Sequence, residues 1–150
     1  MRIIIQRVSS AIVMIEKEVV AAIEKGFLIL LGIEIEDKEE DAEWLCRKIA
    51  QLRVFSDENG LMNKDLNEVS GEVLVVSQFT LHASYKKGNR PSFIKSARPE
   101  QAIPLYEYFN KQLSTLMNRK VATGRFGADM KVNLVNDGPV TIIMDTKNKE

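Results

Sequence analysis

The sequence of 150 residues is poor in the residue types on which many functional sites depend. It has one cysteine, Cys46, and one histidine, His82. A single cysteine excludes a disulfide framework and a cysteine-based zinc site, and it fits the reducing cytoplasm. A single histidine excludes any site that needs two imidazoles, and we expect His82 at the surface, near the end of a strand. Because P-loop, GxGxxG and zinc-ligand spacings are also absent, we expect neither a metal nor a cofactor.

Charge of one sign and long hydrophobic runs are missing as well. Lys and Arg number 21, and Asp and Glu number 21, so the net charge is zero and any basic surface for a nucleic acid must be local. The apolar runs are too short for a signal peptide or a membrane span, so we expect a cytoplasmic protein without a membrane partner. With 45% hydrophobic residues, the chain can bury one core, and we expect a single domain over residues 1–150.

Much of the sequence consists of segments that are typical of β-strands. Short runs rich in β-branched residues predict strands at residues 3–5, 12–15 and 19–23. Residues 26–35 are apolar almost throughout, which predicts a central strand covered on both faces. Residues 72–81 predict a further strand that ends in polar side chains.

Two segments have helical periodicity. Apolar residues recur at spacings of three and four in residues 37–52 and again in residues 99–117. Because Pro104 lies inside the second segment, we expect a regular helix only after Ile103. Strands and helices do not alternate as in a doubly wound sheet. The expected class is therefore α+β, with mainly antiparallel strands forming a β-barrel-like core and two flanking helices.

The segment VNDGPVT, residues 135–141, looks like a hairpin turn between strands at 130–135 and 140–145. However, Pro139 directly follows Gly138, and proline cannot donate a hydrogen bond to a neighbouring strand. A simple two-residue turn therefore fits poorly, and the pattern alone does not explain the Gly-Pro pair.

Polar side chains gather at the end of the predicted strand VVSQFTL. Ser77, Gln78 and Thr80 supply two hydroxyls and an amide within four residues. Such groups at the rim of a sheet suit hydrogen bonding to a developing oxyanion or the positioning of a water. The alternative is the outward face of an ordinary strand.

A basic segment follows, without any acidic residue, between residues 85 and 98. Its cations are Lys86, Lys87, Arg90, Lys95 and Arg98. Tyr85 and Phe93 lie among them. Cations with interspersed aromatic rings suit a phosphate backbone with exposed bases, and a merely solvated surface is the alternative.

Six motifs taken together resemble the D-aminoacyl-tRNA deacylase family, in order and over nearly the whole chain. They are IQRV (5–8), VFSDENGLMN (54–63), SQFTL (77–81), RPSF (90–93), TGRFGADM (123–130) and NDGPVT (136–141). The resemblance implies an enzyme that hydrolyses the ester between a D-amino acid, or glycine, and the terminal adenosine of tRNA. Glycine mischarged on tRNA(Ala) is an expected substrate, and L-aminoacyl-tRNA is expected to be spared.

The resemblance also implies a homodimer and a chiral gate. In the family, a Gly-Pro pair with a cis peptide bond enters the active site of the partner subunit, and Gly138–Pro139 matches that pair. Two rigid main-chain oxygens facing the α-carbon would clash with an L side chain while leaving a D side chain free. We expect Arg7, in the matching QRV, to orient the pair through its guanidinium donors.

Further roles carry over to the matching motifs. The expected catalytic residues are Ser77, Gln78 and Thr80. The expected substrate contacts are Phe79, Met130, Gly138 and Pro139. The expected contacts to the tRNA partner are Lys86, Lys87 and Arg90.

The chemical step has two alternatives. Thr80 could be a nucleophile, or the ribose 2′-hydroxyl of the substrate could assist a water while the protein supplies positioning and main-chain donors. We favour the second, because the motif holds no histidine or lysine that could activate Thr80. Two rival functions stay open: a general esterase with Thr80 as nucleophile, and a non-catalytic RNA-binding barrel.

Overall fold

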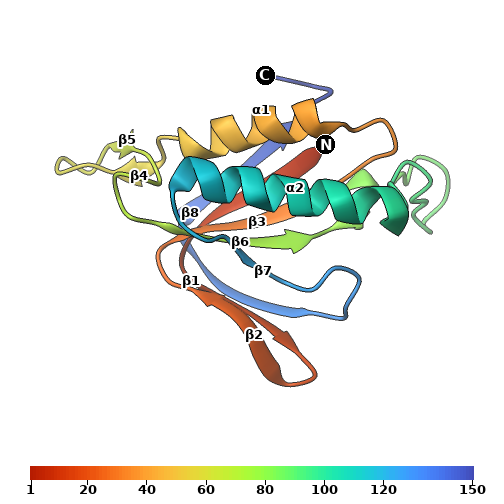
Figure 1. Cartoon of the computed structure of the whole chain (residues 1–150), viewed down its shortest axis with the longest axis horizontal. Helices are drawn as coiled ribbons and strands as arrows, with labels where there is room; N and C mark the ends of the chain where they lie inside the picture. The colour runs from red at the N-terminus through yellow and green to blue at the C-terminus, as the bar shows by residue number, and fades with distance from the viewer.

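Strand β1 (Arg2–Ile15) runs through the molecule and organises its sheet (Figure 1). The computed structural model describes all residues from 1 to 150. The elements that follow β1 are β2 (Glu18–Ile23), β3 (Gly26–Gly32), α1 (Glu39–Ala50), β4 (Phe55–Ser56), β5 (Met62–Lys64), β6 (Glu72–Ser77), the 3-10 helix η1 (Phe79–His82), α2 (Pro99–Met117), β7 (Ala122–Thr123) and β8 (Lys131–Asp145). The two α-helices lie side by side on one face of the sheet, and β4 with β5 forms a small arm to one side.

The main sheet has the order β2-β1-β3-β6-β7. β3 and β2 pair with successive parts of one edge of β1, and β8 pairs with its other edge. β1 is antiparallel to β2, β3 and β8, whereas β6 is parallel to both β3 and β7. β2 approaches β6 and β7, so the sheet is nearly closed into a barrel. The predicted α+β class, with a barrel-like core and two flanking helices, is confirmed.

The predicted strands at 3–5 and 12–15 belong to one continuous strand. β8 pairs with β1 from Arg2 to Met14 and so bridges the polar residues between the two runs. The low strand propensity of Ser9 and Ser10 predicts a break at these residues. Pairing with the long antiparallel strand β8 compensates for this low propensity.

The predicted hairpin at residues 135–141 is wrong. β8 is one strand of 15 residues, and the chain does not reverse at the Gly-Pro pair. Instead the register changes there, because Gln6 faces Thr141 while Val8 faces Asn136. The four residues 137–140 therefore oppose the single residue Arg7 and form a large, irregular bulge, the β8 bulge.

Both predicted helices are present. α2 begins at Pro99, so the expectation of regular helix only after Ile103 is wrong. Pro99 takes the first helical position, where no N–H is needed, and Pro104 is exposed, so the hydrogen bond it lacks lies on the solvent side. Neither helix is long and apolar enough to cross a membrane.

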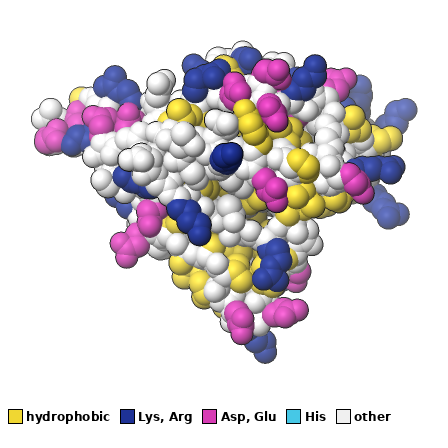
Figure 2. All heavy atoms as spheres, in the orientation of Figure 1, with side chains coloured by type: hydrophobic (Ala, Val, Ile, Leu, Met, Phe, Trp, Pro, Cys, Tyr) yellow, Lys and Arg dark blue, Asp and Glu magenta, His cyan; other side chains and the backbone are white.

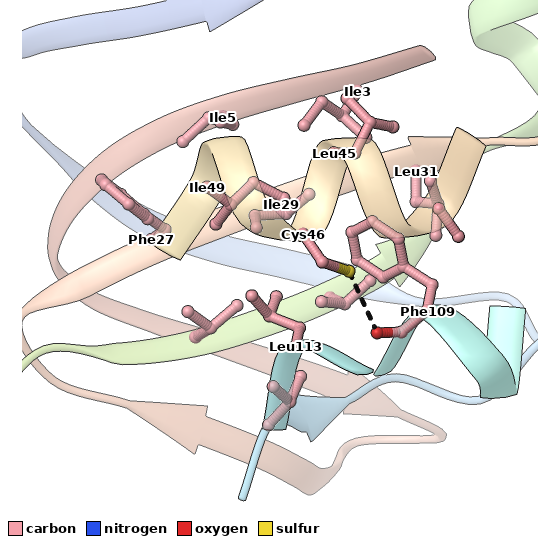
Figure 3. Close-up of a cluster of buried hydrophobic side chains, with 14 of the residues drawn as sticks. Ile3, Ile5, Phe27, Ile29, Leu31, Leu45, Cys46, Ile49, Phe109 and Leu113 are labelled. Carbon is pink, nitrogen blue, oxygen red and sulfur yellow. Dashed lines mark hydrogen bonds between the residues drawn. The ribbon is translucent and has the colours of Figure 1, made fainter. Parts of the chain in front are cut away.

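The larger hydrophobic cluster lies between the sheet and the two helices. Figure 3 shows side chains from β1, β3, α1 and α2 pointing toward one another, among them Ile5, Phe27, Ile49 and Phe109. The Cys46 thiol lies in this cluster and donates to the Phe109 carbonyl at 3.4 Å. Burial raises the pKa of Cys46 to about 12, so this thiol stays protonated at neutral pH and is no nucleophile.

A second, smaller cluster fills the inside of the curled half of the sheet. Its buried members are Val8, Ala11, Val13, Ile23, Leu28, Leu74 and Val76. In β3, Phe27 and Ile29 belong to the larger cluster while Leu28 belongs to the smaller one. This strand is thus covered on both faces, as its apolar run predicted.

Close contact between β3 and β6 depends on Gly26. A Cβ atom at this position would lie 1.8 Å from the Glu72 carbonyl oxygen. Only glycine therefore allows the two strands to approach at this point. Because the strands are parallel, their carboxyl ends reach the same edge of the sheet.

The N-terminal ammonium group is buried beside carboxylates. The nitrogen of Met1 donates to Asp37 Oδ1 and, at 2.8 Å, to Thr146 Oγ1, and Glu34 Oε1 lies 3.8 Å away. The side chains of Met1 and Asp37 are fully buried. This ion pair ties the start of β1 to the turn that precedes α1.

Candidate active site

The parallel strands β3 and β6 bring the SQFTL motif to one edge of the sheet. Ser77, the last residue of β6, pairs with Leu31, and the Gln78 N–H donates to the Leu31 carbonyl at 2.8 Å. The chain then turns into η1, so the strand predicted for residues 72–81 ends at Ser77. Ligands commonly bind beyond the carboxyl ends of adjacent parallel strands.

A pocket of about 310 Å³ opens at this edge. Its lining residues are Leu31, Ile33, Val76, Ser77, Gln78, Phe79, Ala97, Ala102, Phe126, Gly127, Ala128, Asp129, Met130 and Val132. Four of the predicted site residues, Ser77, Gln78, Phe79 and Met130, are thus brought together. Thr80, Gly138 and Pro139 do not line the pocket of their own chain.

Two main-chain donors are free at the start of η1, on the lining residue Phe79 and on the residue after it. Phe79 and Thr80 open η1, so no preceding turn accepts their N–H groups. Neither N–H donates to a carbonyl elsewhere in the chain. A pair of adjacent, unoccupied N–H groups at the end of a strand is suited to a negatively charged oxygen.

The Thr80 hydroxyl lies outside the pocket lining and without a base. Gln78 Nε2 donates to Thr80 Oγ1 at 2.5 Å. His82 is buried rather than at the surface, which corrects the expectation for this residue, and its Nε2 has no hydrogen-bond partner. The structure therefore shows no His–Thr hydrogen bond of the kind that activates a nucleophile.

The pocket itself holds one ionisable side chain, Asp129. This carboxylate is highly exposed and pairs with Lys131 at 3.0 Å. The other lining residues supply apolar surface, hydroxyl and amide groups, and main chain. Such a site is suited to binding and polarising a reactive carbonyl, and much less to supplying a general base.

The Gly-Pro pair lies on the β8 bulge and is exposed. The Gly138–Pro139 peptide bond is cis, and Gly138 has φ +127°. Arg7 lies opposite. Its Nε donates to the Asp137 carbonyl at 3.1 Å and is 3.3 Å from Asp137 Oδ2, and its Nη1 donates to the Val54 carbonyl.

Asn136, to which the sequence pattern assigns no role, is a further support of the bulge. Its Nδ2 donates to the Arg7 carbonyl at 3.0 Å and to the Val140 carbonyl at 2.9 Å. The side chain thus closes the bulge from β8 to β1. Asn136 is the first residue of the motif NDGPVT, so the motif points to this residue. Its contacts depend on the pairing of β8 with β1, which the motif does not reveal.

The predicted tRNA contacts Lys86, Lys87 and Arg90 lie in the exposed loop after η1. Figure 2 shows basic and apolar side chains together on the right-hand edge of the molecule, where Figure 1 places this loop. None of the three cations forms an ion pair within the chain.

One other group of potential ligands lies away from the pocket. Single ligand atoms of Glu34, Asp37 and His82 lie within 4.8 Å of one another. The Met1 ammonium already sits beside both carboxylates, so their charge has a resident counterion. We assign no metal to this cluster.

Comparison with known proteins connects this geometry with a family. Residues 4–145 match the family described as D-Tyr-tRNA(Tyr) deacylase. The chain belongs to this family. The resemblance carried by the six motifs is thereby confirmed, and the match covers the SQFTL edge and the β8 bulge alike.

Relatives of this deacylase family are similar over their whole length. Proteins named D-aminoacyl-tRNA deacylase from Bacteroides thetaiotaomicron and Akkermansia muciniphila are 63% and 60% identical over 150 residues, which is all of this chain and all of theirs.

Solved structures in the comparison agree. One described as the c-Myc DNA unwinding element binding protein has a TM-score of 0.92 at 41% identity and covers 97% of this chain and 99% of its own. Another, a probable eukaryotic D-amino acid tRNA deacylase, has a TM-score of 0.80 at 14% identity, with coverage of 95% and 97%, and supports the fold alone.

Proposed function

We propose that this chain hydrolyses the ester that joins a D-amino acid to the terminal adenosine of tRNA. The observation that carries the proposal is the largely apolar pocket at the SQFTL edge: its lining residue Phe79 and the next residue, Thr80, have free N–H groups, and its one carboxylate, Asp129, is paired with Lys131. An aminoacyl ester is already labile, so orientation and oxyanion stabilisation suffice for acceleration. Family membership supplies the substrate class.

In the proposed reaction a water oxygen attacks the ester carbonyl carbon. Charge develops on the carbonyl oxygen, which accepts hydrogen bonds from the N–H groups of Phe79 and Thr80. The bond from the carbonyl carbon to the ribose oxygen then breaks. The free amino acid leaves, and the ribose oxygen takes a proton and is restored as a hydroxyl.

The proton on the attacking water needs an acceptor, and the one carboxylate of the pocket, Asp129, is highly exposed and paired with Lys131. We assign this assistance to the neighbouring 2′-hydroxyl of the substrate ribose, which takes the proton of the water as it passes its own proton to the departing ribose oxygen, with Ser77 and Gln78 orienting the adenosine and the ester. Thr80 acts through its main chain and through the hydroxyl that accepts from Gln78. Phe79 and Met130 form apolar walls of the pocket.

Selection against L-amino acids is assigned to Gly138 and Pro139 of a partner subunit. The pair is exposed and does not line the pocket of its own chain, so a gate at this pocket must come from a second copy. Val135 and Ile143 on the same strand are 56% and 66% exposed, which gives a dimer apolar surface to bury. Arg7 and Asn136 hold the bulge in place.

A gate that rejects by steric exclusion does not depend on the identity of the D side chain. Glycine has no side chain to exclude, so glycyl-tRNA, including glycine mischarged on tRNA(Ala), is also assigned as a substrate. Lys86, Lys87 and Arg90 contact tRNA phosphates in this proposal.

The test is a deacylation assay with catalytic amounts of protein on three substrates: D-tyrosyl-tRNA, L-tyrosyl-tRNA and glycyl-tRNA(Ala). We expect multiple turnovers on the first and third, and none on the second. Binding of tRNA without turnover would identify a non-catalytic RNA-binding barrel instead. Equal turnover on both tyrosine enantiomers would remove the gate and favour a general esterase.

A further inference from the structure

We infer that exposed apolar side chains of residues 85–94, with the cations around them, bind the unpaired nucleotides that precede the terminal adenosine of the substrate. This inference rests on the proposed function, because it takes the pocket as the place of the aminoacyl ester. It adds a second subsite for single-stranded RNA, formed by Tyr85, Phe93 and Ile94. We call this set of three side chains the apolar shelf.

Two of the three side chains of the apolar shelf are unusually exposed, and the third, Phe93, is half-buried. Tyr85 is 77% exposed and Ile94 is 80% exposed, although both are large and apolar. Phe93 packs edge-on against Phe79, with ring centroids 5.0 Å apart and planes at 76°. Because Phe79 also lines the pocket, the shelf continues directly from the pocket wall.

The base of the shelf is fixed by hydrogen bonds. Ser96 Oγ donates to the Phe79 carbonyl at 2.9 Å, the Ile35 N–H donates to the Lys95 carbonyl at 3.1 Å, and the Ala97 N–H donates to the Ile33 carbonyl at 2.9 Å. Ala97 itself lines the pocket. A surface that is held in place before binding loses little entropy when a ligand stacks on it.

The neck of the loop is closed as well. Ser84 and Ser92 exchange both main-chain hydrogen bonds at 2.8 Å. This pair keeps Tyr85 and Phe93 at the same end of the loop. Tyr85 and Phe93, which packs on the pocket residue Phe79, therefore both lie at the neck of the loop, while Lys86, Lys87 and Arg90 lie farther along it.

The charge of the segment fits RNA. From residue 83 to residue 99 there are five cations and no acidic residue. Lys95 and Arg98 flank the shelf, and neither forms an ion pair in the chain. Bases stack on aromatic rings and pack against neighbouring apolar side chains, while phosphates contact the cations. A base-paired stem would offer only phosphates, so the exposed rings favour an unpaired strand.

The test uses substrates of graded length with one D-tyrosyl ester: D-tyrosyl-adenosine, a D-tyrosyl tetranucleotide ending in CCA, and full D-tyrosyl-tRNA. The variant is the double substitution Tyr85→Ser with Ile94→Ser. We expect kcat/KM to fall roughly tenfold or more on the tetranucleotide and the tRNA, since each lost stack weakens binding severalfold, and to stay unchanged on D-tyrosyl-adenosine.

Leu61→Ser is the matched control, because Leu61 is also an exposed apolar residue but lies on the β4–β5 arm, far from the loop (Figure 1). It should leave all three substrates unaffected. Thermal unfolding of each variant verifies the fold. An equal loss on D-tyrosyl-adenosine would mean that the substitutions distort the pocket and would overturn the inference, as would unchanged kinetics on the tetranucleotide.

A binding measurement separates this inference from the proposed reaction. Fluorescence anisotropy of the unacylated tetranucleotide should show that the double variant binds less tightly than wild type. A blunt RNA duplex of equal charge should bind both proteins alike. A loss confined to the full tRNA would assign Tyr85 and Ile94 to another part of the tRNA and overturn the subsite. Failure of wild type to hydrolyse D-tyrosyl-tRNA would refute the proposed function, whatever the anisotropy shows.

Discussion

Arg7 holds the main chain immediately before Gly138, because its Nε donates to the carbonyl of Asp137 at 3.1 Å. The same guanidinium reaches the Val54 carbonyl through Nη1, at the base of the β4–β5 arm. One buried side chain thus fixes the bulge of β8 relative to a distant segment. Lysine has no second branch that could make both contacts at once.

Replacing Arg7 with lysine should therefore loosen the bulge while the rest of the sheet stays folded. We expect a loss of about 2 kcal/mol in the free energy of unfolding, since at least one buried carbonyl loses its partner. Activity on D-tyrosyl-tRNA should fall as well. Arg53→Lys is the control, because Arg53 also donates to a carbonyl, that of Asn63, but on the exposed arm. Equal effects of the two substitutions would contradict a special role for Arg7.

Gly138→Ala should strongly reduce activity on every substrate. A Cβ atom at Gly138 would lie 2.8 Å from Val140 Cγ2 and 3.0 Å from Arg7 Nη2, and φ +127° is a conformation that alanine avoids. The resulting shift of the bulge should lower kcat/KM roughly 100-fold. Gly60→Ala is the control, because Gly60 also has positive φ but no neighbour within 4 Å. Full activity of the Gly138 variant would show that this position is not part of the working site.

Thr80→Ala should reduce turnover without abolishing it. The substitution removes the hydroxyl that accepts from Gln78, a neutral hydrogen bond worth about 1 kcal/mol, or roughly fivefold in rate. Thr80→Ser should restore most of the rate. Rapid-quench kinetics with acid trapping distinguishes the mechanisms, because an acyl group covalently attached to Thr80 would establish it as the nucleophile and refute the water mechanism.

Asp37→Asn should destabilise the fold far from the pocket. The substitution leaves the buried Met1 ammonium without its closest negative partner, and breaking a fully buried ion pair costs about 3 kcal/mol. Chemical denaturation at neutral pH measures the loss. Glu58→Gln removes an ion pair with Lys64 on the exposed arm and should change stability little. A similarly small change for Asp37→Asn would mean that Thr146 and Glu34 suffice for the ammonium group.

Asp145 should contribute a pH-dependent share of stability. Burial raises its pKa, but hydrogen bonds from the Lys147 N–H and the Arg2 guanidinium outweigh this and hold the pKa below its ordinary value of 3.8. A lowered pKa stabilises the fold above pH 3.8, and the gain is lost as the pH falls further. At pH 7 Asp145→Asn should lose about 1 kcal/mol, because Arg2 is partly exposed. The difference from wild type should shrink below pH 3.8, and a constant difference would contradict this origin.

Local patterns predicted the features that depend on local chemistry. The apolar run of β3 indicated a strand buried on both faces, and the polar end of VVSQFTL indicated a strand end at the site. His82 was misplaced because its burial depends on Gly32, whose missing side chain leaves room for the imidazole. A Cβ there would be 3.1 Å from His82 Cδ2. No periodicity reveals a contact of that kind.

The Gly-Pro segment was misread for a related reason. Asn136, Asp137 and Gly138 have the composition of a turn, and the chain would reverse there if only local preference counted. The pairing of β8 with β1 on both sides of the segment prevents the reversal. The conformation of the segment is therefore set by pairing between strands that lie more than a hundred residues apart in the sequence. A single sequence does not reveal such pairing.

The β8 bulge lies at the border between the two hydrophobic clusters. On one side of it β1 contributes Ile3 and Ile5 to the larger cluster, and on the other it contributes Ala11 and Val13 to the smaller one. Each cluster fixes the register of its own half of the β1–β8 ribbon. A change in the length of residues 137–140 would thus leave both halves aligned, whereas the same insertion elsewhere in β8 would turn its side chains to the wrong face. The segment assigned to substrate selection is the part of this strand whose length does not set the register of the paired residues on either side.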